Sequence, residues 1–198
     1  MAHGSIKFDK MSSFRLESAL AYSARFHAKQ QRKGTRIPYI AHPLAVASIV
    51  LEYGGNEDEA IAALLHDVIE DGGGKRAREE IRQLFGSKVA AIVDGCTDTD
   101  RMPKPPWKQR KIAYIARLSK ESRSVLLVSA ADKLHNARAI LADYRILGES
   151  LWERFKGHRN TLWYYRELAD TFKAIQKHPR LTEELNRVVS ELEELASV

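Results

Sequence analysis

The chain has 198 residues, of which 44% are hydrophobic and 29% are charged, a composition typical of one globular domain with a full core. The net charge of +6 indicates an anionic partner but does not distinguish a nucleotide from a nucleic acid. No apolar run is long enough for a bilayer, no secretory leader is present, and the single cysteine, Cys96, excludes an internal disulfide. We therefore expect a cytoplasmic protein with no membrane partner.

Helical periodicity dominates the chain, and no segment shows the alternating pattern typical of strands. Residues 1–8 are predicted to be a leader or a disordered segment, and residues 9–198 are predicted to form a single domain. The fold class that follows is all-α, a helical bundle of roughly eight or nine helices.

Caps and helix breakers set the expected boundaries. Ser12 or Ser13 and Asn56 are expected as N-caps, and residues 38–43 are expected to be extended, because a residue before proline avoids helical angles. Residues 98–106 are charged and proline-rich, and this loop is predicted to be mobile. In chain order, the predicted helices span residues 12 to about 29, 43–53, 56–71, 75–85, 87–98, 107–120, 122 or 124 to about 147, 149–177 and 179 onward.

The third predicted helix ends in a cluster of polar groups, His66-Asp67 followed by Glu70-Asp71. Residues four apart lie one above the other on a helix, so Glu70 is expected above His66 and Asp71 above Asp67. One imidazole and three carboxylates repel one another and resist desolvation unless a cation lies among them. The pattern therefore predicts a divalent metal ion and a metal-dependent hydrolase.

Two distant residues offer further ligands: His42, just before Pro43, and Asp132, beside the buried stripe of the long helix. Two imidazoles and two carboxylates suit manganese, iron, cobalt or zinc, with coordination left open for water. Each residue also has an ordinary explanation. His42 could be a turn residue, the pair on the third helix could lie on the surface, and Asp132 could form a salt bridge with Lys133 or Arg138.

Two nearby residues are predicted to stay outside the chemistry. His135 is interpreted as a satisfied helix histidine, although it neighbours the expected site. Cys96 is interpreted as a small, half-buried residue, because nothing around it marks an activated thiol.

The order His42, His66-Asp67, Asp132 matches the four-ligand signature of the HD-superfamily phosphohydrolases. The sequence that flanks these residues resembles the hydrolase domain of the RelA/SpoT-homologue family, closely over residues 14–142 and loosely elsewhere. The segments that carry this resemblance are Arg32-Lys33-Gly-Thr, Pro38-Tyr-Ile-Ala-His42-Pro43, Ala63-Leu-Leu-His66-Asp67-Val-Ile-Glu70-Asp71 and Ala131-Asp132-Lys-Leu-His-Asn136. With no room for a synthetase domain, the chain resembles a stand-alone small alarmone hydrolase of the stringent response.

The resemblance implies an all-α HD domain that binds one Mn²⁺ and removes the 3′-pyrophosphate from alarmones such as (p)ppGpp. Other divalent ions remain open as the cofactor. The metal ligands would be His42, His66, Asp67 and Asp132. The water would be positioned and deprotonated by Glu70 and Asp71. The substrate would meet Arg32 and Lys33, then Asn136 at the ribose or its phosphate, with Lys133 and Arg138 as additional cations near the phosphates.

Two departures from the family pattern fall near the expected nucleoside pocket. The loop between Lys33 and His42 is one residue longer than in the long bifunctional relatives, and Ala139 replaces a hydroxyl or acidic side chain. The base, guanine or adenine, therefore stays open, as do the 5′-phosphate preference and the oligomeric state.

Three alternative functions also follow from the sequence. The first is an HD phosphohydrolase for NADPH, a deoxynucleotide or a cyclic dinucleotide. The Arg32-Lys33 loop and the Glu70-Asp71 pair argue against it.

The second is a nucleic-acid-binding helical module, suggested by the basic stretch 104–111. A solvated helix face explains that stretch more simply, so no nucleic-acid partner is expected. The third is a non-catalytic relative, against which the full set of metal and acid residues argues.

Overall fold

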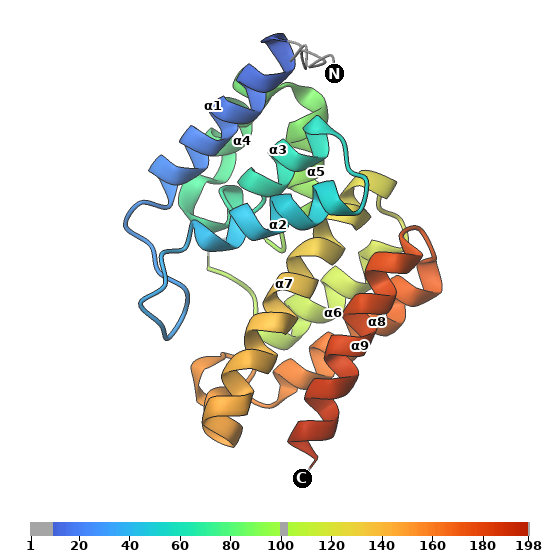
Figure 1. Cartoon of the computed structure of the whole chain (residues 1–198). Coiled ribbons are helices and arrows are strands. Elements are labelled where there is room, and N and C mark those ends of the chain that lie inside the picture. The colour runs from blue at the N-terminus through green and yellow to red at the C-terminus, as the bar shows by residue number, and fades with distance from the viewer. Residues whose placement is uncertain (1–9, 100–102, 198) are drawn as a thin grey trace, which may run out of the picture.

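The computed structural model describes residues 10–99 and 103–197, so the predicted leader or disordered segment, residues 1–8, lies outside it. The described residues form nine α-helices and no strand, with one isolated bridge between Gln31 and Pro38 (Figure 1). The prediction of an all-α fold is confirmed. In chain order the elements are α1 Lys10–Phe26, α2 Ala41–Glu52, α3 Glu57–Leu65, a π-helix η1 Ile69–Gly73, α4 Gly74–Phe85, α5 Ser87–Cys96, α6 Trp107–Leu118, α7 Arg123–Leu147, a 3₁₀-helix η2 Gly148–Arg154, α8 Asn160–Ile175 and α9 Pro179–Ala196.

Local caps fix the starts of two helices that carry the site. At α3 the Asn56 side chain accepts from the Glu59 amide at 3.1 Å, and the Glu59 carboxylate accepts from the Asn56 amide at 2.8 Å. At α7 the Ser122 hydroxyl accepts from the Val125 amide at 3.2 Å. These bonds satisfy amides that the first turn of a helix leaves without partners, and both caps were predictable from the sequence.

Several boundaries differ from the prediction. α1 begins at Lys10, before Ser12 and Ser13, so neither serine marks its start. α2 begins at Ala41, because Pro43 fits a first turn, where its missing amide hydrogen is not needed. The helix predicted over residues 149–177 is broken into η2 and α8. His158 between them has a φ of 47°, a left-handed conformation that cannot continue a right-handed helix.

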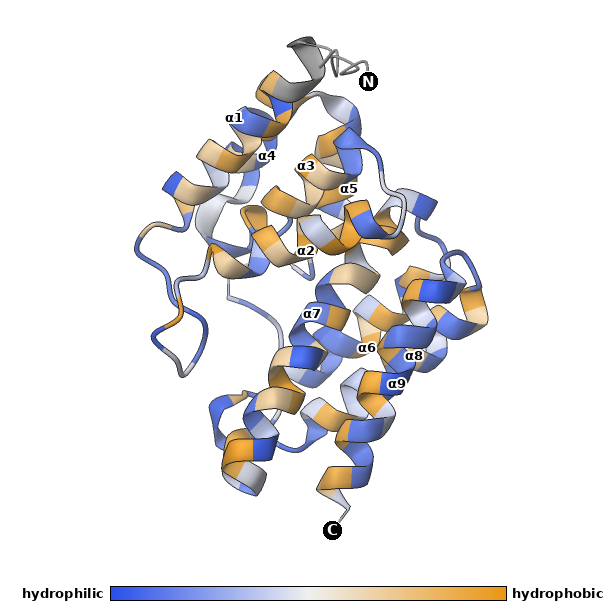
Figure 2. Cartoon of the chain, in the orientation of Figure 1, coloured by the Kyte–Doolittle hydropathy of each residue, from blue (hydrophilic) through white to orange (hydrophobic). Residues whose placement is uncertain are grey.

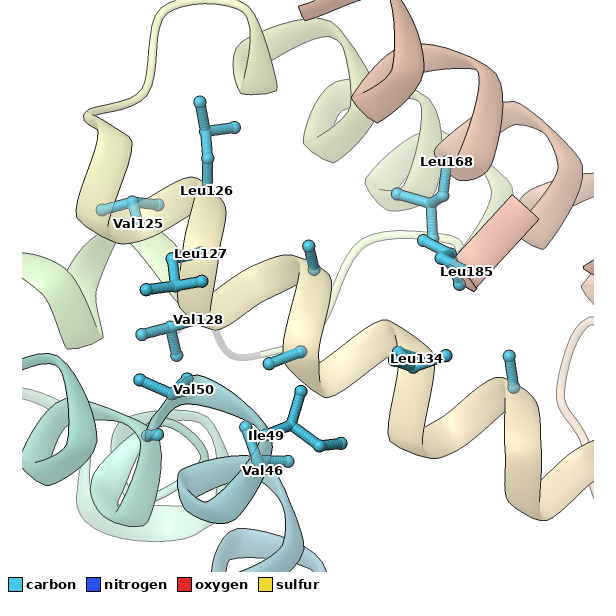
Figure 3. Close-up of a cluster of buried hydrophobic side chains, with 14 of the residues drawn as sticks. Val46, Ile49, Val50, Val125, Leu126, Leu127, Val128, Leu134, Leu168 and Leu185 are labelled. Atoms are coloured by element: carbon cyan, nitrogen blue, oxygen red, sulfur yellow. The ribbon is translucent and has the colours of Figure 1, made fainter. Parts of the chain in front are cut away.

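Helix α7 is the centre of the core. It crosses the molecule between α2 on one side and α8 and α9 on the other (Figures 1 and 3). Leu127 and Val128 of α7 lie toward Val50 of α2 in Figure 3, and all three side chains are buried. Fully burying one such side chain stabilises a fold by about 1.5–3 kcal/mol, so these contacts fix α2 against α7.

Hydropathy follows this packing. Figure 2 shows hydrophobic residues along α2 and α3, whereas α9 alternates between hydrophobic and hydrophilic residues. α2, α3 and α7 pack against one another in all three pairings, so the three regions that carry the predicted ligands meet. Within residues 10–99 and 103–197, no helix has both the length and the apolar character that crossing a membrane requires.

Candidate metal centre

The helix predicted to run through Asp71 is interrupted. α3 ends at Leu65, and the chain re-forms as the π-helix Ile69–Gly73, in which the Gly73 amide donates to the Val68 carbonyl at 3.1 Å. Glycines allow the chain to turn at the end of this segment: Gly72 has a φ of 134° and Gly74 a φ of 48°, and a Cβ on Gly73 would lie 2.1 Å from the Cβ of Ala77. The Asp71 amide still donates to the Asp67 carbonyl at 2.9 Å, so Asp71 remains one turn beyond Asp67.

The four predicted metal ligands converge. Ligand atoms of His42 on α2 and of His66 and Asp67 after α3 all lie within 4.8 Å of one another. Asp132 reaches them from α7, with its Oδ1 3.2 Å from His42 Nε2 and 3.7 Å from His66 Nε2. The Oδ2 of Asp67 lies 3.1 Å from His66 Nε2 and 3.5 Å from His42 Nε2.

The hydrogen bonds of His66 show that this arrangement fits a cation. Its Nδ1 lies 2.7 Å from the Ala63 carbonyl, which can only accept, so Nδ1 carries the proton. Its buried Nε2 has no hydrogen-bond partner among the described residues and faces two carboxylates. The two carboxylates favour a positive charge at this nitrogen and raise the pKa of His66 in spite of its burial. A proton or a divalent ion can supply that charge. Two nitrogen and two oxygen donors suit such an ion.

Both carboxylates are ionised in this setting. Burial alone would raise the pKa of Asp67, but the imidazoles of His66 and His42 hold that pKa below its usual range. Burial also opposes ionisation of Asp132, and there the Lys133 ammonium, then the two imidazoles, lower the pKa. Charged ligands therefore face the centre at neutral pH.

A second layer of side chains holds the ligands. The Tyr39 hydroxyl donates to Asp67 Oδ2 at 2.6 Å, and burial, followed by the Asp67 charge, raises the pKa of Tyr39 so that the donor keeps its proton. The amide of Asn136 donates to Asp132 Oδ1 at 2.5 Å. His135 lies with its Nδ1 2.8 Å from His42 Nδ1.

Sequence reasoning missed Tyr39 and underrated His135. His135 stands three residues after Asp132 on α7, so helical spacing gave a signal for it, whereas Tyr39 precedes α2 and had no such signal. Neither could be assigned a partner, because each contact joins residues far apart in the chain.

A cavity of about 440 Å³ opens beside the centre. Four of the five predicted substrate residues line it: Arg32, Lys33, Lys133 and Asn136, together with Ala139, Phe155 and Tyr165. The Arg32 guanidinium donates to the side-chain oxygen Oδ1 of Asn136 at 2.6 Å. This hydrogen bond joins the loop that carries Arg32 to α7. Arg138, the fifth, is exposed and lies 3.3 Å from Glu184 of α9 instead. An adjoining hollow of about 360 Å³ shares Lys33 and Lys133 with the first and adds Lys111 and Lys156.

Glu70 lines the adjoining hollow, and Glu70 and Asp71 both line a third hollow together with Thr99 and Lys104. Glu70 Oε1 lies 3.0 Å from Lys104 Nζ, an ion pair that the sequence did not suggest. Burial and the neighbouring charges of Asp67 and Glu70 raise the pKa of Asp71 to about 6. A carboxylate with such a pKa can exchange a proton near neutral pH, although the catalytic role of both residues stays a prediction.

Comparison with known proteins gives a family and several relatives. The model of the HD domain family matches residues 19–163. A GTP pyrophosphokinase of Streptomyces coelicolor is 32% identical over 93% of this chain and 22% of its own length. Guanosine-3′,5′-bis(diphosphate) 3′-pyrophosphohydrolase MESH1 of Xenopus tropicalis is 40% identical over 61% of this chain and 66% of its own. The chain thus spans about a fifth of the first relative and about two thirds of the second.

One solved structure is similar over almost the entire chain. It is that of a metazoan orthologue of SpoT, described as hydrolysing ppGpp. The two structures superpose with a TM-score of 0.75 at 25% sequence identity, covering 97% of this chain and 98% of the other.

Proposed function

This chain belongs to the HD domain family, and we propose that it is a Mn²⁺-dependent 3′-pyrophosphohydrolase of nucleotide alarmones, (p)ppGpp or (p)ppApp. One observation carries the proposal: His42, His66, Asp67 and Asp132 converge, and three of them line a cavity that cationic side chains also line. The names of the Xenopus protein and of the metazoan structure, which state hydrolysis of guanosine alarmones, support the same substrate class. A cytoplasmic location, where such nucleotides occur, is part of the proposal.

The chemistry starts from the charge on a pyrophosphate ester, which repels an attacking nucleophile. A divalent ion held by the four ligands would offset that charge and lower the pKa of its bound water. Asp71, one turn beyond Asp67, is proposed to accept the proton of the attacking water, and Glu70 to orient that water. Both residues lie in the π-helix that directly follows two of the ligands, which keeps the acid pair next to the centre.

The cavity cations are proposed to hold the phosphates and the nucleoside. Lys133 lies 2.5 Å from Asp132 and also lines the cavity, so its ammonium can meet a phosphoryl oxygen beside the centre. Arg32 and Asn136 already hydrogen-bond each other across the cavity, which pre-organises them for ribose and phosphate oxygens. Arg32 also lies 5.7 Å from the Tyr39 ring, and Lys33 lies beside Phe155.

Two alternatives remain for the test. Another HD phosphohydrolase activity, on NADPH, a deoxynucleotide or a cyclic dinucleotide, would use the same metal ligands. A nucleic-acid-binding role has weaker support, because Arg110 and Lys111 of the basic stretch form ion pairs with Asp98 inside the protein. Those two charges are not free to neutralise a phosphate backbone.

The test is an incubation of Mn²⁺-loaded protein with ppGpp and ppApp, in parallel with NADPH, a deoxynucleoside triphosphate and a cyclic dinucleotide. We expect a nucleoside 5′-diphosphate and pyrophosphate from at least one alarmone, resolved by anion-exchange chromatography. The Asp132→Ala variant is the control and should release nothing. Turnover of another substrate with no turnover of either alarmone would overturn the proposal.

A further inference from the structure

His135 and His42 form a direct contact that the function proposed above does not use. Their Nδ1 atoms lie 2.8 Å apart, and their ring centroids lie 4.9 Å apart with an interplanar angle of 37°. A nitrogen–nitrogen contact of this length is a hydrogen bond, so one of the two rings donates and the other accepts. His42 is almost fully buried, so solvent water cannot replace His135 as the hydrogen-bond partner of its Nδ1.

The direction of the bond follows from the metal centre. The Nε2 of His42 faces Asp67 and Asp132, so it is the nitrogen that would bind the ion. The proton then resides on Nδ1, and His42 must donate to His135.

A ligating histidine usually donates its other N–H to a carboxylate, a carbonyl or water. His66 follows this rule with the Ala63 carbonyl, whereas the acceptor facing His42 is an imidazole. We infer that His135 is a positioning residue, which holds His42 in the tautomer and orientation that bind the metal.

The contact also joins two helices of the centre. His135 lies on α7, one turn after the ligand Asp132, and His42 lies on α2. A single hydrogen bond therefore fixes the spacing of a nitrogen ligand and an oxygen ligand that come from different helices. Its loss would leave both ligands in place but free the His42 ring to rotate and to exchange tautomers, which weakens metal binding before it affects the fold.

The experiment compares two variants by direct metal titration. His135→Phe removes the acceptor and keeps an aromatic ring, whereas His135→Asn keeps an acceptor oxygen near the position of Nδ1. Mn²⁺ affinity is measured by competition with a chelating dye, without substrate. We expect the phenylalanine variant to bind Mn²⁺ about 10–100-fold more weakly and the asparagine variant to recover most of that loss. His178→Phe, at the start of α9, is the matched control and should not change the affinity.

Two results would overturn the inference. One is wild-type Mn²⁺ affinity in His135→Phe. The other is an equal loss in both variants, because an acceptor role predicts rescue by asparagine. Neither result depends on the substrate, so the inference, which rests on the proposed metal centre, can fail while alarmone hydrolysis stands.

A measurement on the unmodified protein covers the case in which a variant does not fold. Long-range ¹H–¹⁵N correlation spectra of the Zn²⁺-loaded protein report the protonation of each imidazole nitrogen. We expect His42 to be protonated at Nδ1 and His135 to be unprotonated at Nδ1. The opposite assignment, with His135 as the donor, would contradict the inference.

Discussion

Asp67 and Asp71 lie one turn apart but in opposite electrostatic settings. The neighbouring imidazoles hold the pKa of Asp67 low in spite of burial, whereas burial and two nearby carboxylates raise the pKa of Asp71 to about 6. Neighbouring carboxylates whose pKa values are driven apart commonly divide their roles between charge and proton transfer. Asp67 is thereby suited to binding a cation and Asp71 to moving a proton.

This division of roles can be tested by substitution. Asp67→Ala removes a proposed metal ligand, and we expect it to abolish both Mn²⁺ binding and hydrolysis. Asp71→Ala leaves the ligands intact, so we expect it to keep Mn²⁺ binding and to lower kcat by about 10²–10⁴-fold, the usual contribution of a general base. Metal titration and steady-state kinetics on the same preparations separate the two effects. Wild-type kcat in Asp71→Ala would exclude a proton-transfer role for Asp71.

Cys96 illustrates a residue whose environment suppresses its chemistry. Burial raises the pKa of this half-buried thiol to about 11, and the Ser129 hydroxyl contacts its sulfur at 3.6 Å. Because the thiolate is the reactive form, alkylation by iodoacetamide at neutral pH should be about a hundredfold slower in the native protein than in urea. Mass spectrometry of timed samples gives both rates. Equal rates would contradict the protected, structural role predicted from the sequence.

At the scale of the elements, the sequence predicts helix boundaries that depend on neighbouring residues, but not contacts between residues far apart in the chain. The Asn56 and Ser122 caps lie within three residues of their partners, so the sequence alone predicts the starts of α3 and α7. The break after Leu65 was not predictable, because no glycine or proline in residues 57–68 marks it. The ligand set came from a family resemblance, and its convergence needed the packing of α2, α3 and α7.

The π-helix leaves no space for a side chain at Gly73. A Cβ there would lie 2.1 Å from Ala77 Cβ and 2.7 Å from the Val68 carbonyl, so Gly73→Ala forces the segment to move. We expect a loss of about 1–3 kcal/mol in the free energy of unfolding and a drop in kcat, because Glu70 and Asp71 shift with the segment. Mn²⁺ affinity should change less than kcat, since none of the four proposed ligands lies in the π-helix itself.

Gly54 offers a matched control for this substitution. It lies between α2 and α3 with a φ of 82° and has open space at its Cβ position. Gly54→Ala should therefore destabilise the protein through backbone strain, by about 1–2 kcal/mol, without changing kcat. A Gly73→Ala variant with normal kcat would show that the exact course of η1 does not matter for turnover.

At the scale of the whole molecule, the metal centre lies where two groups of helices meet. α1 to α5 lie at one end of α7, and α6, α8 and α9 lie along the rest of it (Figure 1). α7 contacts both groups and contributes Asp132, so the site depends on how the groups are held together. Asp98, which follows α5, adds a second connection through ion pairs with Arg110 and Lys111 of α6.

The Asp98 connection predicts a pH-dependent stability. The Asp98 side chain is only 6% exposed. Burial alone would raise its pKa, but Lys111 and Arg110 hold the pKa below its usual value. Folded Asp98 therefore binds protons less readily than unfolded Asp98. Its stabilising effect is complete above the unfolded pKa and disappears as the pH falls through the folded pKa.

Asp98→Asn leaves two partly buried cations without their partner, and we expect it to lower the free energy of unfolding by about 3 kcal/mol near neutral pH. The difference from the wild type should shrink steadily as acid protonates Asp98 in the wild type. Urea unfolding at a series of pH values measures this difference. Glu79→Gln, which breaks an exposed pair with Arg82, is the control and should change stability little at any pH. A constant gap between Asp98→Asn and wild type down to strongly acid pH would mean that packing, not charge, connects α5 to α6.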